Sequence, residues 1–358
     1  MAEDALDVAG CGSMVVDLFH HTPRIIGAEE KILLDSDGKR PAVEAAAGGV
    51  TLNHLGWARV LGLKTGIFGK MGDDRNGEIL RDGMNRLGIE HHLTLDGSAS
   101  SFAAVFLDRQ GNRAIYMMRG ATAELKPEEI RGRHGAFIRR ARMVSTEISQ
   151  LPLSTVVAIL SFAHKQGIPT MLDVDVPPSD ACPGLGSHAQ LKRALKLATY
   201  LKPAKAAARE LVEAKDPRRI AEEVHRRYGS KAVFVTGGAE GCVIAAEGVV
   251  EQIPAFKVKQ VDATGAGDAF LGGVLAGLRW DLPWAAIGRL ANAAGAVCVT
   301  RMGAFPAGFE VRDEIVKLYG GELPIPAWEA DRNRAGSIGQ AGRRLANGRK
   351  PHAKKAEP

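Results

Sequence analysis

Nine consecutive residues, 262–270, place two carboxylates around a short stretch without bulky side chains. They read Asp-Ala-Thr-Gly-Ala-Gly-Asp-Ala-Phe, and an apolar run with helical spacing follows at once. The first backbone N–H groups of a helix lack partners within the helix and carry the positive end of its dipole. Gly265, Ala266 and Gly267 would let an anion approach those donors closely. Asp268 could then take a proton from a hydroxyl group while the amides hold the phosphate that this hydroxyl attacks.

The simpler interpretation makes Asp268 a helix cap and the glycines a tight turn, and a lone Gly-x-Gly-Asp would favour it. The full stretch is more specific. It resembles the signature near the C-terminus of the ribokinase/PfkB family of sugar and nucleoside kinases. In that family the Asp of Gly-Ala-Gly-Asp is the catalytic base, so the resemblance implies this role for Asp268.

Length and composition fit a large globular enzyme. With 358 residues and 45% apolar content, the chain can bury one large α/β core or two smaller ones. No run of eighteen apolar residues occurs, which argues against a membrane span. The acidic N-terminus lacks the order of a signal peptide, and the four cysteines are far apart in sequence. These features predict a cytoplasmic protein with reduced cysteines.

The net charge of +6 is concentrated in one segment. From residue 331 onward there are eight basic and two acidic residues, so the preceding part of the chain is formally neutral. We expect residues 328–358 to be a basic, disordered tail because they offer little to bury. This location argues against nucleic acid as the main partner. An RNA-binding role through the tail stays open as a third hypothesis.

Apolar segments with strand and helix patterns alternate along the chain. We expect strands at 8–16, 64–68, 143–147, 169–174, 198–201 and 231–236, and helices at 52–61, 75–87, 154–165, 188–197 and 217–228. Asp74 could cap the second helix. Such alternation predicts a mostly parallel sheet covered on both faces, with ligands beyond the carboxyl ends of its strands.

Two regions interrupt this alternation. Segments 102–107 and 114–118 predict a β-hairpin, and the polar stretch 19–46 contains short extended pieces such as 31–34. A second hairpin is expected at 242–246 and 249–253. The resemblance implies a ribokinase-like three-layer αβα sandwich over residues 7–320, with a mostly parallel central sheet. It also implies a small β-sheet lid built from about 19–46 and 99–120, which could cover its own site or pair with a neighbour's in a homodimer.

Residues that could hold the acceptor lie mainly in the first third of the chain. Gly48 and Gly49 open a helix and Asn53 follows one turn later, which resembles the family's N-terminal signature, where these residues contact the sugar. Asp17 matches a family Asp that binds sugar hydroxyls, and a carboxylate accepts two such bonds at once. Glu147 resembles a substrate-contacting position. A helix start and ordinary turn residues would explain the same pattern.

Acidic residues lie at the ends of two predicted strands. Glu147 ends the strand at 143–147, and Asp173 and Asp175 end the one at 169–174. Together they could form an acidic rim that holds hydroxyls, or Mg²⁺ through water. Turn chemistry alone would also account for them.

The resemblance also implies a nucleotide site and a cation site. Thr236, Gly238 and Gly241 follow a predicted strand and are similar to the family's nucleotide-binding loop. Asn292 matches a position near the adenine, although a plain surface role on the helix 285–299 explains it equally well. Asp262 and Thr264, with carbonyl groups from 297–303, resemble the family's potassium site.

One departure from the family concerns magnesium. The family usually has Asn-x-x-Glu shortly after the strand at 198–201, where it organises Mg²⁺ waters and phosphate, whereas this chain has Ala204 and Ala207. Neither alanine has a side-chain oxygen, and Glu210 lies one turn further on. Loss of such a supporting element often lowers activity by ~10–100-fold.

The sequence therefore predicts a phosphotransferase. ATP with Mg²⁺ would phosphorylate a hydroxyl of a small sugar-like acceptor, and a sugar, a sugar acid, an inositol and a nucleoside are all open as that acceptor. The alternative is a catalytically weak member of the family that binds sugar or nucleotide as a sensor or as a partner-binding module. A P-loop motif and a serine-hydrolase elbow are both missing from the sequence.

Overall fold

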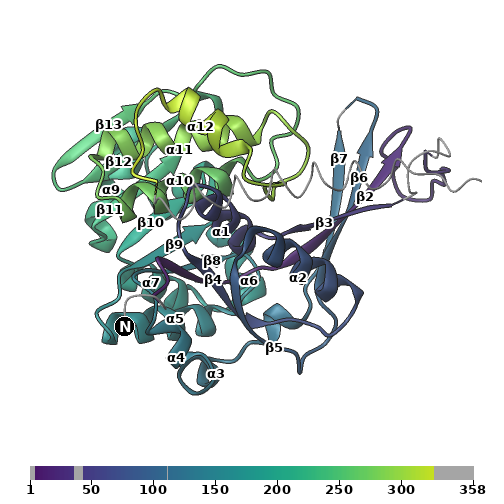
Figure 1. Ribbon diagram of the computed structural model, residues 1–358, viewed down its shortest axis with the longest axis horizontal. Coiled ribbons are helices and arrows are strands. Elements are labelled where there is room, and N and C mark those ends of the chain that lie inside the picture. Colours follow the sequence, from purple (N-terminus) through teal and green to yellow (C-terminus); the bar gives the residue numbers. More distant parts are fainter. Residues whose placement is uncertain (1–4, 36–42, 111, 326–358) are drawn as a thin grey trace, which may run out of the picture. The chain divides into compact units, whose positions relative to one another are not determined.

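The computed structural model describes residues 5–35, 43–110 and 112–325. Within these ranges, nine strands form a central sheet in the order β13-β12-β11-β10-β9-β8-β1-β4-β5 (Figure 1). Neighbouring strands from β11 to β5 run parallel, whereas β12 and β13 join as an antiparallel hairpin. The strands are β1 (Val8–Cys11), β4 (Thr65–Lys70), β5 (Glu90–Thr94), β8 (Val144–Ile148), β9 (Thr170–Val174), β10 (Tyr200–Pro203), β11 (Ala232–Thr236), β12 (Cys242–Ala246) and β13 (Val249–Ile253).

Helices cover both faces of this sheet, as expected for a parallel sheet. One layer contains α1 (Val50–Val60), α2 (Arg75–Leu87), α10 (Ala266–Arg279), α11 (Trp284–Cys298) and α12 (Val311–Tyr319). The other contains α3 (Pro127–Gly132), α4 (Gly135–Ile138), α5 (Leu153–Lys165), α6 (Pro178–Leu185), α7 (His188–Leu197), α8 (Lys205–Leu211) and α9 (Pro217–Tyr228). Two 3₁₀ turns, η1 (Ala121–Glu124) and η2 (Gly238–Glu240), complete the described elements.

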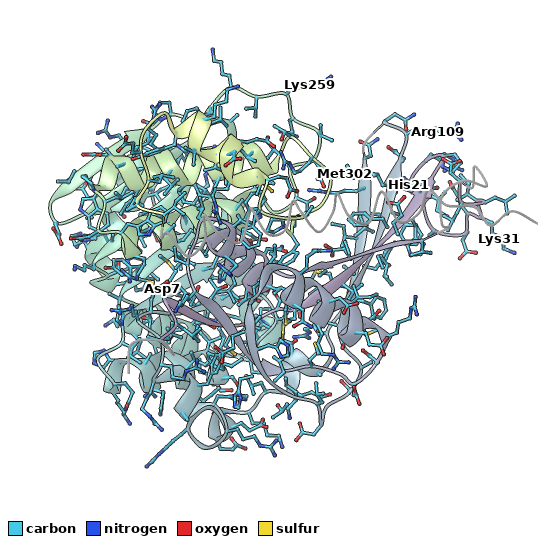
Figure 2. The ribbon with its side chains drawn as sticks, in the orientation of Figure 1. Asp7, His21, Lys31, Arg109, Lys259 and Met302 are labelled. Carbon is cyan, nitrogen blue, oxygen red and sulfur yellow. The ribbon has the colours of Figure 1, made fainter. Side chains whose placement is uncertain are left out.

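A second sheet forms the lid, with strand order β3-β2-β6-β7. Its strands are β2 (Val15–Thr22), β3 (Glu44–Gly48), β6 (Ser101–Asp108) and β7 (Arg113–Met118). Strand β2 pairs parallel with β6, while β3 and β7 join antiparallel at the two edges. Figure 2 labels His21 on β2 and Arg109 in the turn between β6 and β7. The expected three-layer sandwich with a mostly parallel sheet and a small β lid is confirmed.

The single strand expected at 8–16 is wrong. The segment forms two strands, β1 in the central sheet and β2 in the lid. The backbone N–H of Ser13, between them, donates to the buried carboxylate of Glu147 over 2.9 Å. This bond holds the segment between the two strands, and Asp17 lies on the lid strand β2.

Several other expectations can be compared directly with the structure. Helices α2, α7 and α9 begin and end where the sequence predicted, and Asp74 caps α2 by accepting from the Gly77 N–H. The extended piece expected at 31–34 is irregular rather than a strand. The basic tail at 328–358 lies outside the described residues. Over the described part of the chain, no helix combines the length and apolarity needed to span a bilayer.

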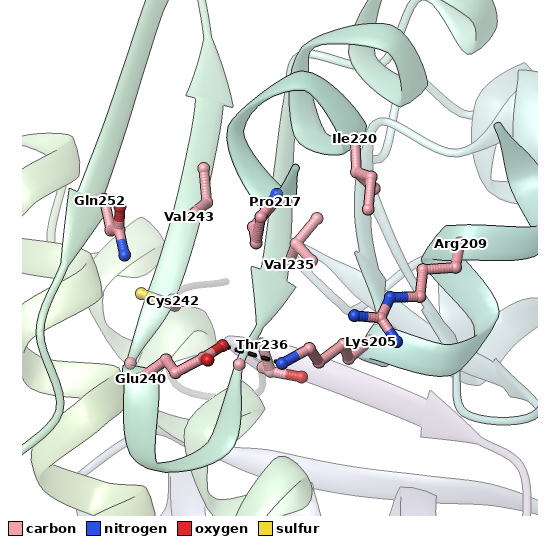
Figure 3. Close-up of a pocket in the computed structure, with 12 residues that line it drawn as sticks. Lys205, Arg209, Pro217, Ile220, Val235, Thr236, Glu240, Cys242, Val243 and Gln252 are labelled. Carbon is pink, nitrogen blue, oxygen red and sulfur yellow. Dashed lines mark hydrogen bonds and ion pairs between the residues drawn. The ribbon is translucent and has the colours of Figure 1, made fainter. Parts of the chain in front are cut away.

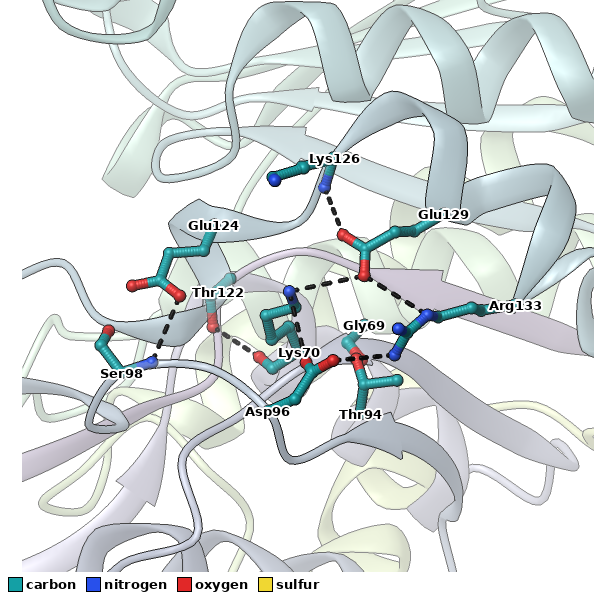
Figure 4. Close-up of polar contacts among 10 residues, drawn as sticks. All are labelled: Gly69, Lys70, Thr94, Asp96, Ser98, Thr122, Glu124, Lys126, Glu129 and Arg133. Carbon is teal, nitrogen blue, oxygen red and sulfur yellow. Dashed lines mark hydrogen bonds and ion pairs between the residues drawn. The ribbon is translucent and has the colours of Figure 1, made fainter.

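A polar cluster closes the end of the sheet where β4 and β5 finish (Figure 4). The Lys70 ammonium, at the end of β4, lies 3.3 Å from an Asp96 oxygen and 3.4 Å from a Glu129 oxygen. Arg133 reaches the same two carboxylates, at 2.9 and 3.7 Å. These contacts connect β4, the segment after β5 and helix α3.

Candidate active site

Asp268 lies in the first turn of α10 and is 7% exposed. The helix begins after Gly265, whose φ of 76° is in the left-handed region and whose Cα approaches Ala304 too closely for a side chain. The Asp268 carboxylate accepts a hydrogen bond of 2.7 Å from the Asn53 amide of α1. No side chain caps this helix, so the simpler interpretation of Asp268 as a cap is wrong.

The backbone beside Asp268 offers unused donors. Among the described residues, the N–H groups of Gly267 and Asp268 have no backbone acceptor. In contrast, the Ala266 N–H donates to the Ala263 carbonyl, and the Ala269 N–H donates to the Gly265 carbonyl. Free N–H groups at the start of a long helix bind anions well. Two backbone N–H groups within residues 265–268 are therefore free to bind an anion, and the anion hole stays a prediction.

A buried cation that the sequence analysis missed lies against this turn. The Lys202 ammonium would be 3.2 Å from a Cβ placed on Gly267, and the Lys202 side chain is only 2% exposed. It pairs with both oxygens of the fully buried Asp173, at 3.0 and 2.9 Å. Lys202 and Asp173 are register partners on β10 and β9. A lysine inside a strand buried on both faces was the available signal, because such a charge must be paired.

The charges around Asp268 shift its titration. Burial, and then the Asp175 carboxylate, raise the pKa of Asp268 well above its usual value. Lys202 and the hydrogen bond from Asn53 act in the opposite direction and favour the ionised form. For Lys202 itself, burial opposes the charge, but the carboxylates of Asp173, Asp175 and Asp268 raise its pKa. The site thus contains a carboxylate of increased basicity beside a retained positive charge.

The predicted acceptor residues form a continuous path from the lid to Asp268. Asp17 lies on β2, and its carboxylate would be 2.6 Å from a Cβ on Gly48, at the end of β3. Gly49 caps α1 with a φ of 102° and approaches the Ser13 carbonyl, so only glycine fits there. Asn53 follows on α1, and its buried side-chain oxygen has no partner among the described residues. Burial, and then the charge of Asp262, raise the pKa of Asp17 to about 6.

Glu147 is fully buried at the end of β8. Its carboxylate accepts from the Ser13 N–H at 2.9 Å, the Thr51 hydroxyl at 3.0 Å and the Ser149 hydroxyl at 2.6 Å. Three donors from the protein satisfy this carboxylate, so its observed role is to hold the Ser13 turn that leads into the lid. Direct contact between Glu147 and a substrate stays a prediction.

The predicted nucleotide residues lie at the end of β11. Thr236, Gly237 and Gly241 line a pocket with Lys205 and Arg209 of α8, and Figure 3 shows the ion pair of 2.8 Å between Lys205 and Glu240. Gly238 lies in the same turn, η2.

Asn292 is buried rather than on the helix surface. Its amide donates to the Ile253 and Pro254 carbonyls, at 3.0 Å each, and so joins α11 to the end of β13. The alternative of a plain surface role for Asn292 is therefore wrong.

The two alanines that replace the expected Asn-x-x-Glu, Ala204 and Ala207, lie at helix α8. Ala204 precedes α8, and Ala207 is fully buried within it. Glu210 does not fill the gap, because both its oxygens are engaged by the backbone and hydroxyl of Ser179, at 2.9 Å each. Asp175 remains, a half-buried carboxylate just after β9 whose charge acts on Asp268 and Lys202.

Asp262 and Thr264 form the turn that leads into Gly265. One Asp262 oxygen accepts from the Thr264 N–H at 2.9 Å and its hydroxyl at 2.7 Å, and the other accepts from the Gly303 N–H at 3.2 Å. A lid side chain joins them: the Arg113 guanidinium lies 3.1 Å from Asp262 and also contacts the Thr264 hydroxyl. The sequence analysis did not single out Arg113.

The chain is similar to several known proteins. Over 279 residues it is 26% identical to the deoxyribokinase of Salmonella typhi, an alignment that covers 75% of this chain and 84% of that protein. It is 26% identical over 248 residues to the bifunctional ribokinase/ribose-5-phosphate isomerase A of Fructilactobacillus sanfranciscensis, covering 67% of this chain and 43% of that larger protein. The solved structure of Arabidopsis thaliana ribokinase complexed with ribose and ATP matches with a TM-score of 0.71 and 20% identity. That match covers 89% of this chain and all of the other.

The structural match establishes a ribokinase-like fold. The family model described as pfkB family carbohydrate kinase matches residues 8–307, which include both lid segments and the Asp268 turn. The chain therefore belongs to the pfkB family of carbohydrate kinases.

Proposed function

We propose that this protein transfers the γ-phosphoryl group of ATP to a hydroxyl of a small sugar-like acceptor, with Asp268 as the general base. One observation carries the proposal. A buried carboxylate, held by Asn53, lies beside free helix-start amides and the Lys202 ammonium. Phosphoryl transfer depends mainly on positioning and on compensation of negative charge, and this turn supplies both.

In the proposed step, the acceptor oxygen attacks the γ-phosphorus, the bond to the leaving ADP oxygen breaks, and the hydroxyl proton passes to Asp268. The N–H groups of Gly267 and Asp268 would donate to the transferring phosphoryl oxygens. Asp17 and the unpartnered Asn53 oxygen would accept hydrogen bonds from acceptor hydroxyls. Closure of the lid would exclude water that would otherwise consume ATP.

Mg²⁺ fits this site in a restricted way. The ion is commonly bound by substrate phosphates with one or two protein carboxylates. Asp175 would be the carboxylate that holds the ion, directly or through water, since Ala204 and Ala207 offer no oxygen and Glu210 is engaged elsewhere. When bound, Mg²⁺ would neutralise charge on the ATP phosphates.

The family and the sugar kinases among the relatives support a sugar as acceptor. A nucleoside is the other acceptor class in the proposal. The nucleotide is expected beside Thr236, Gly238 and Gly241, with Asn292 fixing the β13 segment next to it.

Substitution of the proposed base tests the function. Asp268→Asn keeps the shape of the side chain but removes its ability to accept a proton, so we expect turnover to fall by ~10²–10⁴-fold. ATP binding should change little. Phosphotransfer to a panel of pentoses, hexoses and nucleosides would be measured by product formation, and ATP binding by calorimetry.

Asp313→Asn is the matched control, because Asp313 occupies the same position of its helix, α12, but is exposed. It should leave the rate unchanged. Wild-type turnover by Asp268→Asn would contradict the assignment.

A second candidate rests on the two alanines of α8. A weak enzyme that serves as a sugar or nucleotide sensor would bind ligands in the same panel without forming product on any acceptor. Saturable binding with no turnover by the wild type would favour this candidate over the kinase.

A further inference from the structure

Arg113 is the first residue of β7 and connects the lid to the turn before α10. Its guanidinium lies 3.1 Å from one Asp262 oxygen and also contacts the Thr264 hydroxyl. Only 10% of the Asp262 side chain is exposed to solvent, whereas 39% of the Arg113 side chain is exposed. This ion pair therefore lies at the boundary between lid and body, with the carboxylate on the buried side.

The contacts of Asp262 leave little room for another cation. One carboxylate oxygen accepts from Thr264 twice and from Arg113, and the other accepts from the Gly303 N–H. The Arg113 guanidinium, 3.1 Å from this carboxylate, is the positive charge that faces it. The charge of Asp262 is therefore balanced by a side chain of the same protein.

This arrangement differs from the potassium site that the resemblance implies. A monovalent cation would use side-chain oxygens of Asp262 and Thr264, and Arg113 contacts one Asp262 carboxylate oxygen and the Thr264 hydroxyl. A second positive charge on the same carboxylate would be repelled by the guanidinium at close range. The described residues therefore do not fit a potassium ion while the Arg113 contacts exist.

The charge balance of Asp262 affects the start of α10. Thr264 precedes Gly265, which begins this helix and sets the position of the free N–H groups. An uncompensated Asp262 would also lie in the field of Asp17, whose pKa it raises, and would repel an incoming phosphate. Besides Lys202 at Gly267, a positive charge beside Asp262 would offset this repulsion when the anion hole binds a triphosphate.

We propose that Arg113 supplies this charge in place of a monovalent cation, so that phosphotransfer by this protein does not depend on potassium. The anion hole is then completed when the lid hairpin contacts Asp262 and Thr264. The inference rests on the proposed phosphotransfer. Arg113 is a positioning residue, since it acts through Asp262 and Thr264.

The test compares the wild type, Arg113→Gln and Arg113→Lys in potassium chloride and in choline chloride, each at about 0.1 M so that screening is equal. Arg109→Gln is the matched control, because Arg109 lies in the same hairpin but pairs with Asp35, at 2.7 Å. Initial rates are measured with the best acceptor. Melting temperatures are measured without ATP or acceptor, so that one readout does not require turnover.

The wild type and Arg109→Gln should show the same rate and melting temperature in both salts. Arg113→Gln should be slow in choline chloride. Potassium should raise the rate of this variant about 5-fold or more, which is the lower end of typical coupling between two sites. Potassium should also raise its melting temperature. Arg113→Lys should recover part of the rate in choline. A merely structural role for Arg113 would produce no selective response to potassium.

Two results would overturn the inference: a wild type that gains rate or melting temperature selectively in potassium, or an Arg113→Gln variant that behaves as the wild type in both salts. Failure of the proposed function looks different. In that case no acceptor is phosphorylated in either salt, and the melting temperatures alone decide whether potassium binds once Arg113 is removed.

Discussion

At the scale of single residues, the pKa of Asp268 depends on how the buried charges around it are paired. Lys202 is held by Asp173 on the neighbouring strand and faces Gly267, so it can act on Asp268 without being reached by water. Of the two charges in this pair, Lys202 has the larger effect on the pKa of Asp268. The buried pair therefore favours the ionised, proton-accepting form of the proposed base.

Lys202→Met separates this electrostatic role from stability. The single variant leaves Asp173 buried without a partner and should lose about 3–5 kcal/mol of unfolding free energy. The double variant Lys202→Met/Asp173→Leu should recover most of that stability, because a buried pair replaced by apolar groups is often neutral. It should still be impaired in turnover.

The pH profile reports the direction of this effect. Loss of Lys202 raises the pKa of Asp268 further, so the acidic limb of the kcat profile should move to higher pH. Denaturant unfolding and the pH dependence of kcat would be measured on both variants. A double variant with a wild-type pH profile would remove Lys202 from the proposed mechanism.

At the scale of elements, loops and helix starts are fixed by polar contacts rather than by apolar packing. Glu147 holds the turn between β1 and β2, and Lys70 joins β4 to α3 through Glu129 and to the segment after β5 through Asp96. The side chains of Lys70 and Glu129 are 9% and 12% exposed, so this pair is shielded from water, whereas Asp96 is 49% exposed. Such contacts contribute more than ion pairs at the open surface.

Lys70→Met tests the importance of this cluster. It leaves Glu129, 12% exposed, with only Arg133 as a cationic partner within the cluster, so we expect a loss of about 1–3 kcal/mol in unfolding free energy. Arg24→Gln, which breaks the exposed pair with Glu30, should change stability by less than ~1 kcal/mol. Chemical denaturation of both variants gives the comparison. Equal effects would mean that the Lys70 cluster contributes no more than a surface pair.

Most elements could be predicted because local signals agreed with the fold. Asp74 marks the start of α2, and turn residues separate β12 from β13, so periodicity and capping sufficed. The break between β1 and β2 could not be predicted, since the bond that holds the segment between them joins Ser13 to Glu147 far along the chain. The pairings of Lys202 and Arg113 are likewise long-range.

The residues of the Asp268 turn were identifiable from their types and spacing. Asn53 was predicted to touch the acceptor, and the structure adds a bond from its amide to Asp268. The partners that set the charges in the site come from other strands and from the lid, and no local pattern points to them.

At the scale of the whole molecule, stability should decrease in acid because buried histidines must become charged. His134 is fully buried among Phe68, His92 and Phe137, and neither ring nitrogen has a partner among the described residues. Burial, and then the neighbouring His92, lower the pKa of His134 from 6.5 to about 4. Between these values the unfolded chain binds the proton and the folded protein does not, so stability is lost as pH falls through this window.

His134→Phe should remove this part of the acid sensitivity. At pH 5 the wild type bears a penalty of up to about 2 kcal/mol from His134, calculated at 1.36 kcal/mol per unit of pKa. The variant should therefore be stabilised more at pH 5 than at pH 7.5, as measured by denaturant unfolding. The control is His188→Gln, at an exposed histidine, which should change the unfolding free energy by the same amount at pH 5 and at pH 7.5. An equal effect of His134→Phe at the two pH values would contradict the assignment.

The pairing of β2 with β6 has a consequence for biosynthesis. Val15 pairs with Ser101, and α1, β4, α2 and β5 lie between them in the chain. When β2 leaves the ribosome, its parallel neighbour has not yet been made, and closing so long a loop is slow unless the intervening segment has already collapsed. The lid is thus expected to assemble late on a nascent chain whose central strands have begun to pair. Arg113 can meet Asp262 only after residue 262 has been translated, so until then the growing polypeptide carries an incomplete version of the proposed catalytic centre.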